Sequence, residues 1–246
     1  MGSEWLNIDW SGFFRSWADA EQNFSDQEPI ASPIGACAQG TPVQRDIAKI
    51  FKKPSPSQKQ EIETLIRQEH YQQAIDKIIE YYGINTANVQ PHNGKIIFFD
   101  KDRHGYQEDE PVGNAGTNYN REITVGPGIF TDQYDTVKIG DKEGYRSVDY
   151  AVLCILHEVT HANQIKVGGP ALPDSQKQML YEGMAYDMML AYDKTHLFNL
   201  TAKERENILK RRDSFLDELI PKNRKKYEAC GEYWDVIDSM LRGLIG

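Results

Sequence analysis

Residues 151–165 read AVLCILHEVTHANQI, a nearly continuous apolar run followed by two histidines and a glutamate. The 3.6-residue helical repeat puts His157 and His161 one turn apart on a single face, with Glu158 on the adjacent edge. The apolar residues before the histidines predict that this helix is central and buried. Two imidazoles and a carboxylate are costly to bury without a compensating partner, so the stretch favours a bound metal ion.

The spacing His-Glu-x-x-His is the pattern of zinc metallopeptidase sites. Zinc binds neutral imidazole nitrogen, and a catalytic zinc keeps three protein ligands together with a water of lowered pKa. We therefore expect His157 and His161 to bind Zn²⁺, and Glu158 to take the proton of the attacking water. The competing interpretation is a satisfied pair of histidines in the core.

The predicted third metal ligand is Glu182, which lies among apolar residues of a helix expected over residues 175–192. It follows His161 by 21 residues, enough for the chain to reverse and pack a second helix against the first. A glutamate there completes a His-His-Glu ligand set. The alternatives are Asp174, which also fits a helix N-cap, and Asp187, which also fits a partner that orients a histidine.

The residue that stabilises the transition state is expected in the same region of the chain. Tyr186 and His196 are the candidates for a hydrogen-bond donor to the reacting group, with Tyr181 as an alternative. His196 lies beyond the predicted end of the helix, and it is also a rival for the third ligand position. The sequence therefore leaves this role open among these three side chains.

The chain is expected to form an aromatic-rich segment, residues 1–56, that docks on a single domain, residues 57–246. Trp10, Phe13, Phe14 and Trp17 follow one another at helical spacing in the first segment. The competing interpretations of this segment are an inhibitory pro-segment and a docking surface for a partner. Proline and glycine residues between positions 29 and 42 predict an irregular connection to the domain.

The domain is predicted to be α+β, mainly helical, with a small and mostly antiparallel sheet before the motif helix. Apolar periodicity over residues 57–82 predicts two short helices, the second of which ends at Gly83. Short β-branched or aromatic runs predict strands at 95–99, 121–125 and 136–139, and residues 100–116 are expected to form an exposed loop. One of the last two strands is the candidate edge for an extended substrate.

The C-terminal part is predicted to be helical. Thr201 and Glu204 have the spacing of a capping box, which predicts a helix from there to residue 219. Pro221 opens a further amphipathic helix.

Charge and composition narrow the class of partner. The net charge of −9 over 246 residues argues against nucleic acid and anionic membranes, because both surfaces are negatively charged. No run approaches the roughly 20 apolar residues of a membrane span, and no signal peptide is expected. Three widely spaced cysteines favour a reducing compartment, and Cys154, three residues before His157, is expected to pack rather than to bind metal.

With Glu182 added to the motif, the chain resembles the gluzincin group of zinc metallopeptidases. A closer resemblance is to the metallopeptidase-like domains near the ends of bacterial polymorphic-toxin and Rhs-repeat proteins. Residues 71–84, 156–164 and 182–187 carry this resemblance, which spans roughly residues 57–220. One position departs from the gluzincin pattern, since an aspartate is expected four residues after the ligand glutamate, where this chain has Tyr186.

The resemblance implies a zincin-like domain that uses Zn²⁺ to hydrolyse peptide bonds, either in a target-cell protein or in its own parent polypeptide. It also implies an inhibitory or immunity partner, and a protein that stays in the cytoplasm of the producing cell or leaves by a non-classical secretion system. We expect a zinc endopeptidase acting as a toxin, effector or self-processing domain. The alternatives are a catalytically silent metal-binding module and a zinc amidase that acts on a non-peptide or cell-wall amide.

Overall fold

The computed structural model describes residues 52–103, 106–107, 110–111, 114–133, 135–167, 172–194 and 198–228. Helices make up about 56% of this part, and the sheet is small, which confirms the α+β prediction. The aromatic-rich segment expected over residues 1–56 lies almost entirely outside the described residues, as does His196.

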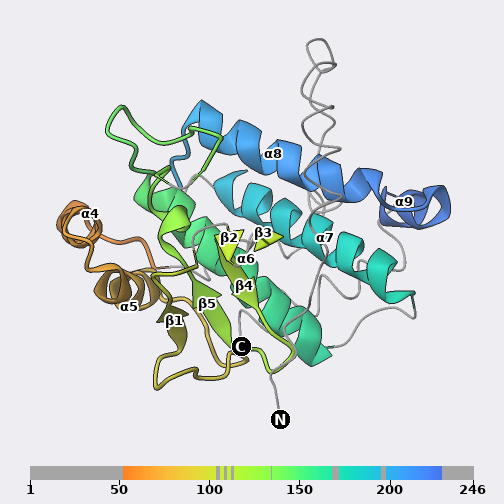
Figure 1. Ribbon diagram of the computed structural model, residues 1–246, viewed down its shortest axis with the longest axis horizontal. Helices are drawn as coiled ribbons and strands as arrows, with labels where there is room; N and C mark the ends of the chain where they lie inside the picture. Colours follow the sequence, from red (N-terminus) through yellow and green to blue (C-terminus); the bar gives the residue numbers. More distant parts are fainter. Residues whose placement is uncertain are drawn as a thin grey trace.

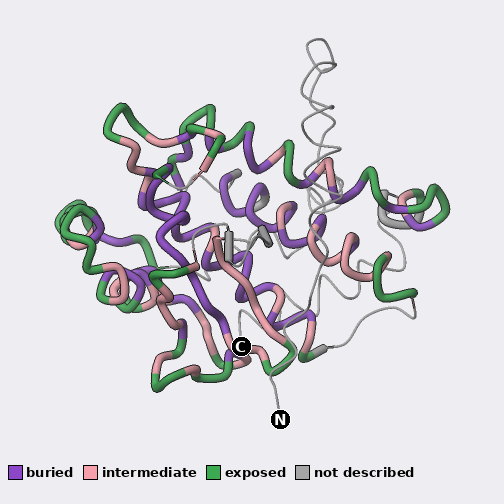
Figure 2. The backbone as a smooth tube through the Cα atoms, viewed as in Figure 1, coloured by how far each residue is buried: buried purple, intermediate pink, exposed green. Residues whose placement is uncertain are grey.

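Two long helices form the centre of the molecule (Figure 1). Helix α6 (Val148–Val167) carries the motif, and α7 (Asp174–Lys194) packs beside it. Helix α6 is buried along most of its length, whereas α7 is exposed or half-buried at its start and mostly buried from its middle onward, as Figure 2 shows. Helix α8 (Ala202–Asp217) packs on α7. The predicted central helix and its partner are therefore confirmed, and both are slightly longer than the apolar pattern indicated.

Two shorter helices precede the sheet, as the apolar periodicity predicted. Helix α4 (Pro56–Arg67) begins with a capping box in which Ser55 accepts from the main chain of Gln58. Helix α5 (Tyr71–Tyr82) ends at Gly83, whose φ of 64° lies in the left-handed region that glycine tolerates best.

The sheet has three short strands in the order β1-β5-β4, which are β1 (Ile97–Phe99), β5 (Ile123–Val125) and β4 (Ala115–Thr117). Strand β1 pairs with β5 in parallel, while β4 pairs with β5 antiparallel. The prediction of a mostly antiparallel sheet is therefore wrong, because the chain between β1 and β5 reverses twice and returns in its original direction. A separate hairpin, β2 (Tyr106–Gln107) with β3 (Glu110–Pro111), lies in that connection.

The expected strand at 136–139 does not form. This segment belongs to a loop that wraps around the Asp132 carboxylate, which accepts from the Gly140 main chain at 2.5 Å and from Arg146 at 2.9 Å. Lys138 donates to the main-chain carbonyl of Asp132. Side chains rather than a neighbouring strand thus satisfy the polar groups of this loop, and a run of β-branched residues is not enough to make it a strand.

The start of α6 is fixed by a buried carboxylate. Asp149 accepts hydrogen bonds from Lys59 at 2.7 Å, from the Tyr82 hydroxyl at 2.8 Å and from the Asn199 main chain at 2.8 Å. The Thr201 capping box predicted for α8 is confirmed, and its Glu204 also accepts from the Ser147 main chain. These contacts tie α4, α5 and the segment before α8 to the first turn of the motif helix.

Two further elements complete the described fold. A single 3-10 turn, η1 (Pro127–Ile129), follows β5, and α9 (Pro221–Glu228) begins at the predicted proline. Among the helices of the described part, none is both long enough and apolar enough to cross a bilayer.

Candidate metal centre

Three side chains from α6 and α7 converge on one point. The Nε2 atoms of His157 and His161 lie 3.0 Å apart, and Glu182 approaches them with Oε2 at 3.2 Å from His157 and Oε1 at 3.4 Å from His161. They are the one group of potential metal ligands found among the described residues. The structure thus brings the two motif histidines and the predicted third ligand together.

The spacing of these atoms fits a tetrahedral zinc site. Zinc bonds of about 2.0–2.2 Å separate neighbouring ligand atoms in a tetrahedron by roughly 3.3–3.6 Å. The two imidazole nitrogens lie 3.0 Å apart, about 0.3 Å below that range, and one ligand atom from each of the three residues lies within 4.8 Å of the others, so small adjustments would bring them around one ion. Two imidazole nitrogens and a carboxylate also match the donors that zinc prefers in catalytic sites.

The cluster is shielded yet still reachable from solvent. Side-chain exposure is 8% for His157, 13% for His161 and 20% for Glu182, so one side of the group remains open. Burial lowers the pKa of His161, but the Glu182 carboxylate outweighs it and raises that pKa to about 9. Burial raises the pKa of Glu182, but the two imidazoles outweigh it and hold the pKa well below its usual range. Glu182 is therefore ionised and available as a ligand.

Glu158 is held by a threonine from the sheet. Thr117 Oγ1 lies 2.8 Å from Glu158 Oε2 and 2.9 Å from the Glu158 main-chain carbonyl oxygen, so its single proton is shared between two acceptors. Thr117 ends β4, the strand that packs on α6. The carboxylate is thereby fixed through one oxygen, beside the histidines. Sequence reasoning missed Thr117, because the contact joins residues 41 apart.

Gln164 is a second residue that the sequence interpretation missed. Its Oε1 atom lies 2.7 Å from Nδ1 of His161, and its Nε2 donates to the main-chain carbonyl of Tyr181 at 3.1 Å. The spacing alone could have indicated it, since residues three apart share a helix face. Gln164 thus connects one expected ligand to the residue that precedes the other, Glu182.

Tyr186 lies against the first histidine of the motif. Its ring centroid is 4.4 Å from that of His157, and on its other side the ring stacks on Phe215 at 5.8 Å. Burial raises the pKa of the Tyr186 phenol above its usual value, although the Arg211 guanidinium acts in the opposite direction. The phenol is therefore protonated at neutral pH and keeps a proton to donate.

Asp174 and Asp187, the alternative ligands that lie in the described part of the chain, do not join the cluster. Asp174 opens α7, two turns before Glu182, and Asp187 faces α8, where its carboxylate accepts from Arg212 at 3.3 Å. Five residues correspond to about 140° around a helix, so Asp187 and Glu182 face different neighbours. Asp187 therefore pairs with an arginine of α8. Cys154 is also outside the metal-ligand group, and burial raises the pKa of its thiol to about 12.

The edge of the sheet beside the motif is a different strand from those expected. Strand β5 is central, residues 136–139 form no strand, and β4 is the strand next to α6. At Ala115 this edge is covered, because Arg103 Nη2 donates to its carbonyl oxygen at 2.9 Å. A Cβ atom at Gly116 would lie 2.3 Å from the same nitrogen, which explains a glycine where the pattern for a strand is weak.

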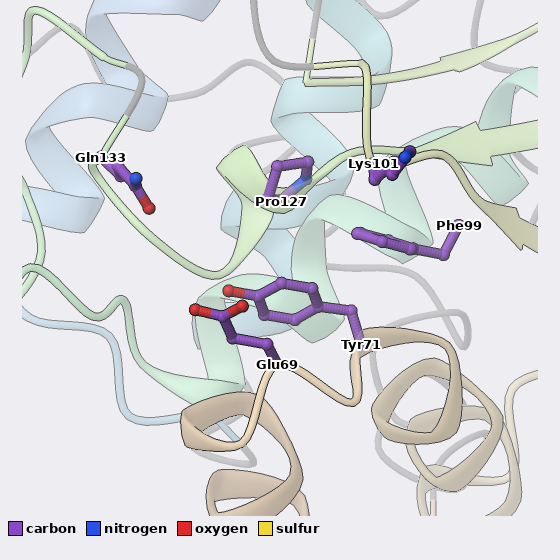
Figure 3. Close-up of a pocket in the computed structure, with 6 residues that line it drawn as sticks. All are labelled: Glu69, Tyr71, Phe99, Lys101, Pro127 and Gln133. Carbon is purple, nitrogen blue, oxygen red and sulfur yellow. The ribbon is translucent and has the colours of Figure 1, made fainter.

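A pocket of about 180 Å³ lies apart from this centre, between the α4–α5 turn, the end of β1 and η1 (Figure 3). Its walls are aromatic or cyclic side chains with polar groups at the rim, namely Glu69, Tyr71, Phe99, Lys101, Pro127 and Gln133. None of these residues belongs to the metal-ligand group, and no set of ligands converges in the pocket.

Comparison with known proteins adds no family to these observations. No protein-family model matches the chain, and neither a curated protein nor a solved structure is significantly similar to it.

Proposed function

We propose that this protein is a zinc-dependent endopeptidase of the zincin-like class, with His157, His161 and Glu182 as the metal ligands. The observation that carries the proposal is the convergence of two imidazoles and a carboxylate at tetrahedral spacing, with an anchored carboxylate, Glu158, on the same helix. A core pair of histidines would not require a third side chain from α7 directed at both rings.

Glu158 and Tyr186 each have a part in the proposed amide hydrolysis. Bound zinc would supply Lewis acidity, which lowers the pKa of water and polarises the scissile carbonyl. Glu158 keeps one oxygen on Thr117 and uses the other to accept a proton from the attacking water. It then transfers this proton to the leaving nitrogen as the C–N bond breaks. Tyr186, whose ring lies against His157, would donate a hydrogen bond from its phenol to the oxygen on which negative charge develops.

The substrate is proposed to lie as an extended strand along β4. The Asn118 N–H donates to the Glu122 carbonyl at 3.0 Å, so the neighbouring main-chain groups of Thr117 point away from β5. Within the described residues β4 ends the sheet, and its last residue is the one that holds Glu158. An added strand would thus run beside the base, while Arg103 covers the edge at Ala115 and limits the strand at that end.

Glu158→Gln separates catalysis from metal binding. The amide keeps the size of the carboxylate and can accept from Thr117, but it cannot take up a proton, so we expect a loss of roughly 10²- to 10⁴-fold in turnover with unchanged zinc content. The zinc-loaded protein is incubated with a panel of denatured proteins and, separately, with purified cell-wall polymer. The cleavage products are identified by mass spectrometry. Glu143→Gln, at an exposed position on the 131–146 loop, is the matched control.

The same experiment distinguishes the alternatives. Cleavage of the protein panel that is lost in Glu158→Gln and kept in Glu143→Gln supports the proposal. Release of cell-wall fragments alone would mean an amidase, and zinc binding without any product would mean a catalytically silent module. Undiminished cleavage by Glu158→Gln would show that the base has been assigned wrongly.

A further inference from the structure

Gln164 is buried completely within α6, and both ends of its amide are used. One end, Oε1, lies 2.7 Å from Nδ1 of His161, one turn earlier on the same helix. The other end, Nε2, donates at 3.1 Å to the carbonyl oxygen of Tyr181 on α7. Tyr181 directly precedes Glu182, so one amide contacts both helices that supply the proposed ligands.

The contact with Tyr181 fixes the direction of the amide. A main-chain carbonyl only accepts hydrogen bonds, so the amide must turn its NH₂ group toward α7 and its oxygen toward His161. Amide oxygen also only accepts, which requires Nδ1 of His161 to carry a proton. In a neutral imidazole the other nitrogen, Nε2, then holds the lone pair, and Nε2 is the atom that faces His157 and Glu182.

The other motif histidine has no such partner. Nδ1 of His157 is buried and makes no hydrogen bond to any described residue. The ring is held instead by packing, with the Tyr186 ring centroid at 4.4 Å. Of the two imidazoles, His161 is therefore the one whose Nδ1, on the side away from the cluster, is held by a hydrogen bond to a described residue.

We propose that Gln164 is a positioning residue of the metal centre, which selects the metal-binding tautomer of His161 and holds α7 in the register that presents Glu182. This inference rests on the proposed zinc site, and it does not depend on peptidase activity. Hydrogen-bond partners of metal-bound histidines usually contribute about 10- to 100-fold to metal affinity. Gln164 adds a link between the two helices to that role.

The test measures zinc affinity by competition with a chromogenic chelator. Gln164→Met keeps the size and flexibility of the side chain but removes both hydrogen bonds, so we expect zinc to bind about 10- to 100-fold more weakly. Gln164→Glu keeps an acceptor for Nδ1 of His161 and loses the donor to Tyr181, so its affinity should fall between those of the wild type and Gln164→Met. If Gln164→Met does not fold, Gln164→Glu still tests the proposal.

Asn163→Leu is the matched control on the neighbouring position. Asn163 is also buried, and it bonds Asn88 at 2.6 Å and the Val159 carbonyl at 2.9 Å without touching a proposed ligand. Its loss should lower stability while zinc affinity stays within about twofold, because no histidine loses a partner. Visible spectra of the cobalt-substituted proteins report the ligand geometry independently of stability.

Each outcome has a separate meaning. The positioning role is supported if Gln164→Met binds zinc more weakly than Asn163→Leu and if the affinity of Gln164→Glu lies between those of Gln164→Met and the wild type. This support holds even if no substrate is cleaved. In that case only the proposed peptidase function fails. Equal affinities of Gln164→Met and the wild type would overturn the inference while leaving the zinc site intact. A wild-type protein that binds no zinc would overturn both.

Discussion

At the scale of single residues, the centre is built from groups that neutral side chains hold in place. Thr117 holds the carboxylate of Glu158, and Gln164 holds the ring of His161. Each of these contacts uses a neutral donor or acceptor, so it fixes the geometry of a charged or metal-binding group without adding charge beside it. A centre of this kind is sensitive to small changes in side chains that take no direct part in the reaction.

Thr117→Val tests this sensitivity. Valine has the shape of threonine without the hydroxyl, so the Glu158 carboxylate loses a hydrogen bond and can rotate. A hydrogen bond to a charged group is worth about 1.5–3 kcal/mol, and we expect kcat to fall roughly tenfold or more while KM and zinc content change little. Steady-state kinetics on a peptide that spans a cleavage site found in the panel of denatured proteins give both constants. Thr117→Ser should restore kcat, and failure of serine to do so would assign the loss to packing instead.

The cluster of proposed ligands was predictable from sequence, while the residues that contact them were only partly so. His157 and His161 lie on one helix, where the repeat fixes their relation, and Glu182 needed only a reversal of the chain between two helices. Gln164 follows the same helical rule. Thr117 could not be predicted, because its contact with Glu158 depends on the order of the strands and on a strand that the sequence does not indicate.

At the scale of elements, α7 has two functional faces. Glu182 and Tyr186, four residues apart, face α6 and the histidines, whereas Asp187 faces α8 and Arg212. The side chains of the Asp187–Arg212 pair are 0% and 2% exposed, so both charges are removed from water. This face therefore anchors the helix and leaves the other to present its side chains to the metal centre.

Asp187→Asn should weaken the fold without weakening the metal site. Breaking a buried ion pair leaves a charge without its full compensation, and we expect a loss of about 3 kcal/mol in the free energy of unfolding, measured with urea. Glu206→Gln, which breaks the exposed Lys210–Glu206 pair on α8, should cost less than about 1 kcal/mol. Zinc affinity should remain that of the wild type in both proteins. A large drop in the affinity of Asp187→Asn would mean that the aspartate does orient the ligands.

The helices could be predicted more fully than the sheet, for physical reasons. Capping residues such as Ser55 and Thr201 act within one turn, so the sequence around them is enough. Strand formation depends on a partner elsewhere in the chain. Residues 136–139 have strand-like composition but fold around Asp132. Gly116 lies in a real strand because β4 pairs with β5, and its missing side chain leaves room for Arg103.

At the scale of the whole molecule, the elements stack as α4 and α5, the sheet, α6, α7 and α8 (Figure 1). One buried hydrophobic cluster runs through these layers, from Ile62 in α4 to Leu219 after α8. The proposed ligands lie at the interface between α6 and α7, near the middle of this stack. A metal bound there joins two layers that would otherwise be held by packing and the Gln164 amide, so its effect should extend to the stability of the whole domain.

Zinc should therefore raise the unfolding temperature, and Glu182 should be required for this. A ligand at 100 times its dissociation constant stabilises the folded state by about 2.7 kcal/mol, which corresponds to a rise of roughly 5–10 °C in Tm for a domain of this size. Calorimetry with and without a chelator measures the shift. Glu182→Ala removes the only ligand from α7, so its Tm should barely respond to zinc, whereas Asp174→Ala, at the start of the same helix, should respond like the wild type. An equal shift in Glu182→Ala would mean that the metal is held on α6 alone and that α7 contributes packing rather than a ligand.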